Sequence, residues 1–216
     1  MLSVLILSCD AYEDTWYPFF ILKNKYWKAC PYKTYIMTET KDCEYAETIK
    51  VQGAWTKRFR EALKQIPTDY VLIMLDDFFI RDYVDQDRIN KIKFDKDIAV
   101  FNFEKAYNMP TLKKSVNGFN LRPNRAPYLN SCQPSVHNKK KLLKRLKKDQ
   151  TPWEWELTTI DSNDEFYINT QGFIIDIGYY HFKPWSIKGG KWCKEIVPFF
   201  EKEGIAVDYG KRGFHI

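Results

Sequence analysis

Two neighbouring carboxylates, Asp76 and Asp77, are the residues of this sequence best suited to chemistry. They directly follow residues 70–75, an uninterrupted apolar run that is typical of a central strand covered on both faces. Ligands of open α/β sheets bind beyond the carboxyl ends of the strands. Adjacent carboxylates repel each other, so two ionised groups favour a nearby cation, and a divalent ion there can neutralise a diphosphate. The alternative is that the pair only caps a turn.

A second candidate is the segment Gly53-Ala-Trp-Thr-Lys-Arg58, which precedes an amphipathic pattern. Free backbone N–H groups at a helix start, together with Lys57 and Arg58, suit a diphosphate, and of the two cations we favour Arg58. The alternative is that both are solvated surface charges. The three histidines are too dispersed to predict a metal site, and no P-loop, nucleophile-elbow or dinucleotide-binding glycine motif is present.

The strand-end motif carries a family resemblance. A strand ending in Leu75-Asp76-Asp77-Phe78-Phe79, in a chain whose first strand ends in Ser8-Cys9-Asp10, resembles the GT-A nucleotide-sugar glycosyltransferases. More narrowly, it is similar to small bacterial enzymes of surface-polysaccharide synthesis. The family's D-x-D motif reads Leu75-Asp76-Asp77 here, so its first acidic position is lost. The resemblance implies that Asp77 binds Mn²⁺ or Mg²⁺ and that Asp76 contributes to nucleotide binding. It also implies that His181 or His215 is a candidate for a further metal ligand, although a structural role is favoured for either.

The resemblance also implies a nucleotide site at the mouth of the first strand. Ser8, Asp10 and Tyr12 lie there, and Arg58 is expected to contact the donor from the helix start. Lys191 is implied as a phosphate contact, in a glycine-rich segment that closes over the donor. Two local alternatives stay open, because Asp10 also suits a helix cap and Gly-Gly before Lys191 also suits an ordinary turn.

The segment Pro152-Trp-Glu-Trp-Glu156 matches the family's catalytic base, an acidic residue at the start of a helix after the acceptor-binding segment. The resemblance implies that Glu156, or alternatively Glu154, takes the proton of the acceptor hydroxyl. Gln133 and Trp153 are then expected to bind the acceptor. The alternative is that both acids only favour the helix N-terminus electrostatically.

Strands and helices alternate through the first part of the chain. The patterns predict strands over residues 2–7, 32–37, 48–51 and 70–75, and helices beginning near Asp14 and Trp55. This order predicts an α/β fold, GT-A-like by the resemblance, with a mixed, mainly parallel sheet and helices on both faces. We expect one domain, with a nucleotide-binding half over residues 1–103 and an acceptor-side half over residues 104–216. The second half is predicted to contain strands over residues 98–103 and 173–177. It is also predicted to contain three helices, one over residues 138–148, one beginning near Pro152 and one over residues 192–203.

Positive charge is concentrated in residues 139–148, which carry seven basic residues and no acidic ones. Without them the net charge of +6 would become −1, which argues against a general nucleic-acid binder. Three leucines form a stripe in this segment, so it is either a basic helix resting on an anionic membrane or a helix docked by its leucines. The second interpretation is favoured. No 18-residue apolar run occurs, and an odd number of cysteines without a C-x-x-C pair favours a reducing cytoplasm.

The resemblance implies a glycosyltransferase that moves a sugar from a nucleotide-sugar donor to a hydroxyl of a cell-surface glycan or lipid-linked glycan, with inversion at the anomeric carbon. Two alternatives stay open. A non-catalytic carbohydrate-binding or scaffold protein would explain the aromatic content of 17% without a role for Asp77. A nucleotidyltransferase would use the same strand-end acids, but the acidic, glycine-free segment after the first strand argues against it.

Overall fold

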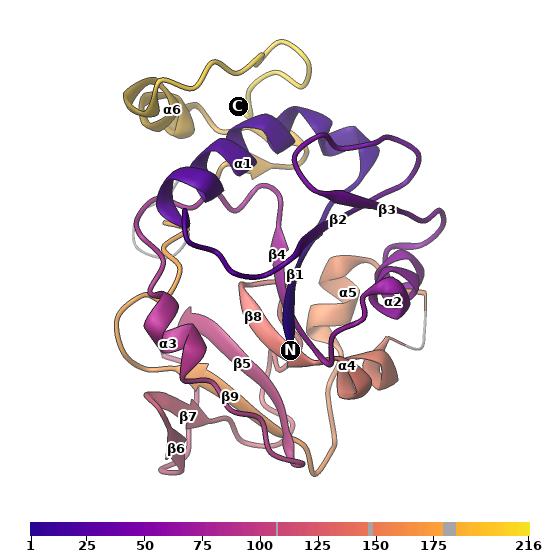
Figure 1. Ribbon diagram of the computed structural model, residues 1–216, viewed down its shortest axis with the longest axis vertical. Helices are drawn as coiled ribbons and strands as arrows, with labels where there is room; N and C mark the ends of the chain where they lie inside the picture. Colours follow the sequence, from indigo (N-terminus) through magenta and orange to yellow (C-terminus); the bar gives the residue numbers. More distant parts are fainter. Residues whose placement is uncertain (107, 147–148, 179–184) are drawn as a thin grey trace.

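A nine-stranded sheet organises the protein in the computed structural model, which describes residues 1–106, 108–146, 149–178 and 185–216 (Figure 1). The strand order is β3-β2-β1-β4-β8-β5-β9-β7-β6. The strands are β1 (Leu2–Leu7), β2 (Thr34–Thr38), β3 (Glu47–Lys50), β4 (Tyr70–Leu75), β5 (Ile98–Lys105), β6 (Ser115–Val116), β7 (Phe119–Leu121), β8 (Ser135–Asn138) and β9 (Glu165–Asn169).

The sheet is mixed and mainly parallel, as predicted. Strands β3, β2, β1 and β4 pair in parallel, and so do β5 and β9. Strand β8 lies antiparallel between β4 and β5, and β7 lies antiparallel between β9 and β6. Following these pairings across the sheet, seven of the nine strands run in one direction and only β8 and β7 run in the other.

Helices cover both faces of the sheet. Alternate residues of β1, β2 and β4 point to opposite sides, and each side builds its own core. One face packs against α1 (Glu13–Tyr26), α3 (Gln86–Asn90) and α6 (Val197–Glu203). The other packs against α2 (Trp55–Gln65), α4 (Lys139–Arg145) and α5 (Pro152–Leu157). The predicted α/β architecture is therefore confirmed.

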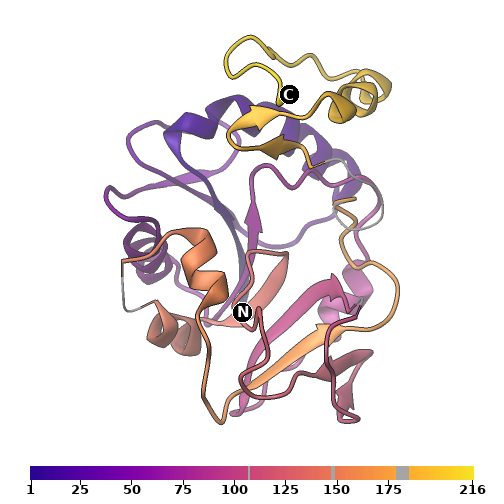
Figure 2. The same cartoon turned by 180° about the vertical axis from the view of Figure 1, so that it is seen from behind.

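The C-terminal part of the chain returns to the N-terminal helix. A hairpin of β10 (Ile187–Lys188) and β11 (Lys191–Trp192) leads through one short 3₁₀ helix, η2 (Lys194–Ile196), into α6. The segment after α6 lies beside α1 in both views (Figures 1 and 2). Glu203 accepts hydrogen bonds from Lys25 and Tyr26 of α1, which fixes this arrangement.

Two of the predicted elements are wrong. Residues 173–177 form no strand, because the carbonyl groups of Ile174 and Asp176 accept the backbone N–H groups of Asp85 and Arg81 outside any ladder. The apolar run is nevertheless buried at Ile174 and Ile175. The predicted helix 192–203 begins only at Val197, since Trp192 belongs to the hairpin. Strands β8 and β9, which lie within the sheet, were not predicted.

The basic segment is docked onto the protein by its leucines. Leu142 and Leu146 are fully buried against the α2 side of the sheet, and Leu143 is partly buried there. Lys139 donates to the carbonyl of Ile66, while Lys140 and Lys144 are exposed. Lys147 and Lys148 lie outside the described residues. The leucine stripe is therefore not available to a membrane, and none of the helices described is both long and apolar enough to span one.

We predict that Leu142→Ala lowers the free energy of unfolding by about 2–5 kcal/mol, because it leaves a cavity where α4 meets the sheet. Urea denaturation followed by circular dichroism measures the change. The matched control is Lys140→Ala on the exposed side of the same helix, which should cost less than about 0.5 kcal/mol. Equal, small effects of the two substitutions would show that the leucines do not dock α4.

Candidate active site

A cavity of about 540 Å³ opens at the carboxyl ends of β1 and β4. Its walls come from both halves of the chain: Ser8, Cys9 and Tyr12 after β1, the start of α2, the segment after β4, residues 132–133 before β8, α5, and the β10–β11 hairpin. Eight residues predicted for the site line it together, namely Ser8, Tyr12, Arg58, Asp76, Asp77, Gln133, Trp153 and Glu156. The carboxyl-end location agrees with the behaviour of open α/β sheets.

Asp76 is held at the floor of the cavity by Ser8. The two are brought together because β1 and β4 pair in parallel with Leu7 opposite Leu75. The Ser8 hydroxyl donates to Asp76 Oδ2 and accepts a hydrogen bond from Trp16 Nε1 at 2.7 Å. Only 3% of Asp76 is exposed, and burial followed by the charge of Asp77 raises its pKa strongly. Ser8 and Asp76 thus form a buried unit rather than two independent ligand contacts.

Asp77 is the carboxylate that faces the cavity. It is partly exposed, and its side chain forms no hydrogen bond or ion pair with another residue of the described chain. Burial raises its pKa, while the positive charge of Arg212 partly opposes that rise. A carboxylate in this position is suited to bind a cation.

The residues present fit a divalent cation that is shared with a substrate. Across the described ranges no group of three or more His, Cys, Asp or Glu side chains forms a closed metal centre. Mg²⁺ is commonly held by one or two carboxylates together with substrate phosphates and water, and Asp77 supplies such a carboxylate. Of the two late histidines, His181 lies outside the described residues and His215 does not line the cavity.

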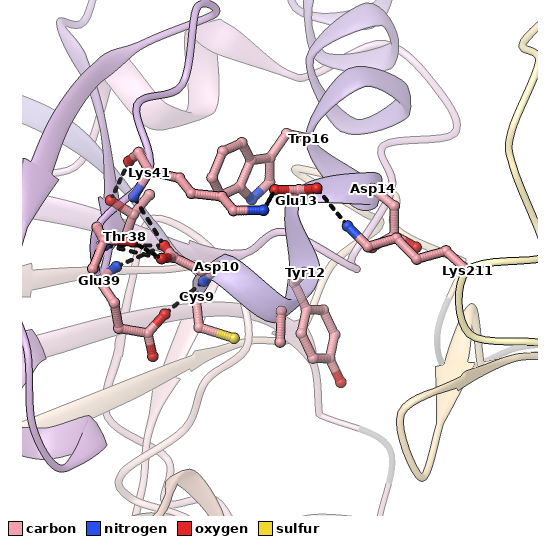
Figure 3. A network of polar contacts seen from close by, with 12 residues as sticks. Cys9, Asp10, Tyr12, Glu13, Asp14, Trp16, Thr38, Glu39, Lys41 and Lys211 are labelled. Atoms are coloured by element: carbon pink, nitrogen blue, oxygen red, sulfur yellow. Dashed lines mark hydrogen bonds and ion pairs between the residues drawn. The ribbon is translucent and has the colours of Figure 1, made fainter.

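Asp10 does not line the cavity, contrary to its predicted role at the nucleotide. Its carboxylate accepts the backbone N–H groups of Glu39, Thr40 and Lys41 and the Thr40 hydroxyl, so it anchors the loop after β2 (Figure 3). Although burial alone would raise its pKa, these hydrogen bonds lower it to about 2. Nor does Asp10 cap the following helix. Its oxygens bind residues of the loop after β2 instead.

Arg58 lines the cavity but is also part of the structural framework. Its side chain is almost fully buried, and Nη1 lies 2.9 Å from Glu39 Oε1 and 3.3 Å from the carbonyl oxygen of Ser8. Glu39 Oε2 in turn accepts the backbone N–H of Asp10 at 2.6 Å. The Arg58 Nε atom is buried without a hydrogen-bond partner. Glu39, which the sequence did not single out, therefore connects the first helix turn, the loop after β2 and α2.

Tyr12 forms a wall of the cavity and is fixed from outside by Arg212. The guanidinium carbon of Arg212 lies 4.3 Å from the centre of the Tyr12 ring. Arg212 also pairs with Asp14 and donates to the carbonyl oxygens of Ala11 and Gly190. Burial, and then the charge of Asp77, raise the pKa of Tyr12 to about 12, so its hydroxyl stays protonated and remains a donor.

The structure separates the two glutamates of α5. Glu154 is exposed, and its carboxylate accepts the Thr151 N–H at 2.7 Å in a capping box with the Thr151 hydroxyl. These bonds lower its pKa. Glu156 lines the cavity and accepts the Cys132 N–H at 2.6 Å, and burial raises its pKa. Glu154 is thus used as a helix cap outside the cavity, whereas Glu156, the first candidate of the two, is the one that lines the cavity.

The acceptor-side candidates differ in exposure. Gln133 is only 6% exposed and lines the cavity, and its Oε1 atom is buried without a hydrogen-bond partner. Gln133 is thus a polar residue of the cavity wall whose amide oxygen has no protein partner. Trp153 is 71% exposed and forms the rim. The pair thus offers one polar anchor inside the cavity and one aromatic face at its entrance.

The hairpin supplies a different lysine from the one predicted. Lys188 lines the cavity with Gly189 and Gly190, whereas Lys191 does not. Both glycines have positive φ, 57° and 75°, which allow the tight turn between β10 and β11. The predicted Lys191 therefore lies outside the cavity wall, and Lys188 is the lysine of this hairpin that lines it.

Comparison with known proteins gives only distant similarities. No protein-family model matches the chain, and a search of curated proteins gives no significant match. Among solved structures, the galactosyltransferase LgtC in complex with donor and acceptor sugar analogues has 10% identity and a TM-score of 0.45, over 78% of this chain and 72% of that one. TarS of S. aureus has 12% identity and a TM-score of 0.46, over 79% and 36%.

The bifunctional IspDF from Campylobacter jejuni has 11% identity and a TM-score of 0.42, over 74% of this chain. This chain spans about half of IspDF, 49% of its length. Because identities and scores are this low, the assignment of a function depends on the geometry of the cavity.

We predict that Asp10→Asn destabilises the protein by about 1 kcal/mol at pH 7, an effect moderated by solvent screening. The folded pKa is depressed, so the stabilisation is present above the unfolded pKa near 3.8 and is lost as the pH falls through about 2. The difference from wild type should therefore shrink between pH 4 and pH 2 in urea denaturation. Asp42→Asn, which breaks only an exposed pair with Lys50, is the control. If Asp10→Asn had the same free energy of unfolding as the wild type at pH 7, Asp10 would not anchor the loop after β2.

Proposed function

We propose that this protein is a glycosyltransferase that transfers a sugar from a nucleotide-sugar donor to a hydroxyl group of a cell-surface glycan, with inversion at the anomeric carbon. The glycan acceptor is proposed to be a lipid-linked polysaccharide, lipopolysaccharide or capsule precursor. The observation that carries the proposal is the meeting of Asp77 and Glu156 in one cavity. These carboxylates come from opposite halves of the chain. Asp77 is placed to bind a cation, and Glu156 is placed to accept a proton.

The donor is proposed to lie along the N-terminal wall. Tyr12 and the backbone after β1 would contact the nucleoside, while Arg58 and Lys188 provide positive charge beside Asp77. Mn²⁺ or Mg²⁺ held by Asp77 would neutralise the charge that develops on the departing diphosphate. Asp76 supports this arrangement from below through Ser8, without requiring a direct ligand contact.

The acceptor is proposed to enter past Trp153 and donate a hydroxyl hydrogen bond to Gln133 or Glu156. Glu156 takes the proton of the acceptor hydroxyl, and the oxygen of that hydroxyl forms the new bond to the anomeric carbon. The bond from that carbon to the diphosphate oxygen breaks, and the nucleoside diphosphate departs with the electron pair. Attack on the face opposite the leaving group inverts the anomeric configuration. A cytoplasmic location stays a prediction from the sequence.

We predict that Asp77→Asn removes metal-dependent donor binding. Thermal shift with a panel of UDP-, GDP-, CDP- and dTDP-sugars, with and without Mn²⁺, should reveal one donor class that stabilises the wild type only with the metal. The stabilisation should be lost in Asp77→Asn and kept in the control Asp82→Asn, an exposed acid outside the cavity. A carbohydrate-binding module would show no metal-dependent affinity. Unchanged binding by Asp77→Asn would refute the proposed metal role.

We predict that Glu156→Gln lowers kcat for sugar transfer by about 10²–10⁴-fold, because the amide cannot accept the hydroxyl proton. Glu154→Gln is the matched control two residues away and should keep near-normal transfer. It should instead lower the free energy of unfolding by up to about 1 kcal/mol through its weakened cap. Release of nucleoside diphosphate from the donor found above, with water or glycans as acceptor, measures the rate. Near-normal turnover of Glu156→Gln would exclude it as the base.

A further inference from the structure

The candidate base is oriented by a loop, residues 130–134, and not by α5 alone. Glu156 Oε1 accepts the backbone N–H of Cys132 at 2.6 Å, and Gln133 follows directly in the same loop. Asn130 Nδ2 donates to the carbonyl oxygen of Trp155 at 3.0 Å, immediately beside Glu156. The position of this loop therefore affects both Glu156 and the unsatisfied amide oxygen of Gln133.

A chain of buried hydrogen bonds holds the same loop from behind. Arg145 Nε donates to Asn130 Oδ1 at 3.1 Å, and Arg145 Nη2 lies 3.2 Å from His137 Nδ1. His137 Nε2 lies 2.8 Å from the Ser135 hydroxyl, which donates to the carbonyl oxygen of Gln133 at 2.8 Å. Asn130, Ser135 and His137 are at most 1% exposed. The chain thus runs from α5 through the loop and α4 into β8 and back to Gln133.

The direction of every bond in this chain is determined by the groups present. Arginine only donates, so His137 Nδ1 must accept. The Ser135 hydrogen is used on Gln133, so Ser135 must accept from a proton on His137 Nε2. His137 is therefore neutral with its proton on Nε2, and burial, followed by the charge of Arg145, lowers its pKa well below the usual value. A second proton on His137 would place two donors against each other.

Arg145 is an unusual member of the basic segment because it points inward. Its guanidinium carbon lies 5.1 Å from the centre of the Phe166 ring, and Nη1 is buried without a partner. Burial lowers its pKa to about 10, although the charge of Asp164 opposes this. Asp164 itself is ion-paired with Lys141. Arg145 is partly buried as a residue, and holding its guanidinium against neutral acceptors with one nitrogen buried and unpaired is costly.

We propose that Asn130, Arg145 and His137 are positioning residues of the acceptor site, whose hydrogen bonds fix the loop 130–134 and thereby the orientation of Glu156 and Gln133. The inference rests on the proposed function in assigning Glu156 as the base. The physical coupling between the buried chain and the Glu156 carboxylate does not depend on it. Each hydrogen bond of this buried network has a fixed donor and a fixed acceptor. The network is therefore satisfied only when the loop adopts one conformation.

The experiment measures the pKa of Glu156 without any substrate. Carboxyl ¹³C NMR of glutamate-labelled protein follows the titration, and Glu156→Gln identifies the signal. Asn130→Ala releases the loop from both α5 and Arg145, so the Cys132 N–H to Glu156 bond should weaken. The pKa of Glu156 is then expected to rise by about 0.5–1 unit, since that bond stabilises the carboxylate.

Two further variants keep the test decisive. Arg145→Lys retains the charge but not the fork that reaches Asn130 and His137 together, so it should shift the pKa in the same direction. Lys144→Ala removes an exposed charge from the same helix and should leave the pKa unchanged. None of these variants alters the titratable or charged groups around Glu156 in the cavity: Cys9, Tyr12, Arg58, Asp76, Asp77, Cys132 and Lys188.

The proposal is overturned if folded Asn130→Ala or Arg145→Lys melts at a lower temperature while the pKa of Glu156 stays within about 0.2 unit of wild type. Should Asn130→Ala not fold, Arg145→Lys alone gives the answer. Once a donor is known, the coupling variants should lower kcat and leave the KM for the donor unchanged. A pKa shift combined with full activity of Glu156→Gln would keep the coupling and reject the proposed base.

Discussion

The parallel pairing of β1 with β4 is the constraint on which the site depends. Its register, Leu7 opposite Leu75, places Ser8 beside Asp76 where both strands end. The Ser8 hydroxyl then binds Asp76 inside the protein, and the next residue, Asp77, is left to face the cavity. Two adjacent acids in water would be equivalent. Here one is buried in a hydrogen-bonded unit and the other stays accessible, so the pair provides one anchor and one carboxylate that faces the cavity.

An antiparallel strand brings the second half of the chain to the same edge. Strand β8 pairs with β4 so that Ser135, at its start, lies opposite Ile73 near the carboxyl end of β4. Because β8 runs in the opposite direction, the residues that precede it emerge beside Asp76 and Asp77. Cys132 and Gln133 are therefore delivered to the cavity, and Cys132 orients Glu156. Seven strands of common direction build the edge, and the reversed strand β8 completes the site on it.

Much of this could be predicted from the sequence, for reasons that are local. Strand β4 and the acids after it are visible because a buried strand must be apolar on both faces. Strand β8 was missed because its polar residues, Ser135 and His137, are satisfied by Arg145 and by the loop before it, which no local pattern reveals. Glu154 and Glu156 lie about 200° apart around a helix, so only one can face the cavity. The burial of Trp155 leaves the two acids on either side of it, and tertiary contacts separate them: Glu154 is used in the capping box with Thr151, whereas Glu156 accepts the Cys132 N–H at the cavity.

Long-range charge pairs account for the remaining corrections. Asp10 looked like a local cap, yet its partners lie 29–31 residues away in the loop after β2. Lys41 and Lys211 reach Glu13 from opposite sides (Figure 3), while Arg212 binds Asp14 and the hairpin carbonyl of Gly190. The first helix is thereby tied both to the loop after β2 and to the C-terminal segment. Since Arg212 also covers Tyr12, a displacement of the hairpin that carries Lys188 would be transmitted to the proposed nucleoside wall. Arg212 therefore contacts both sides of the cavity, Tyr12 on one and the hairpin on the other, which is a property of the tertiary structure and not of any motif.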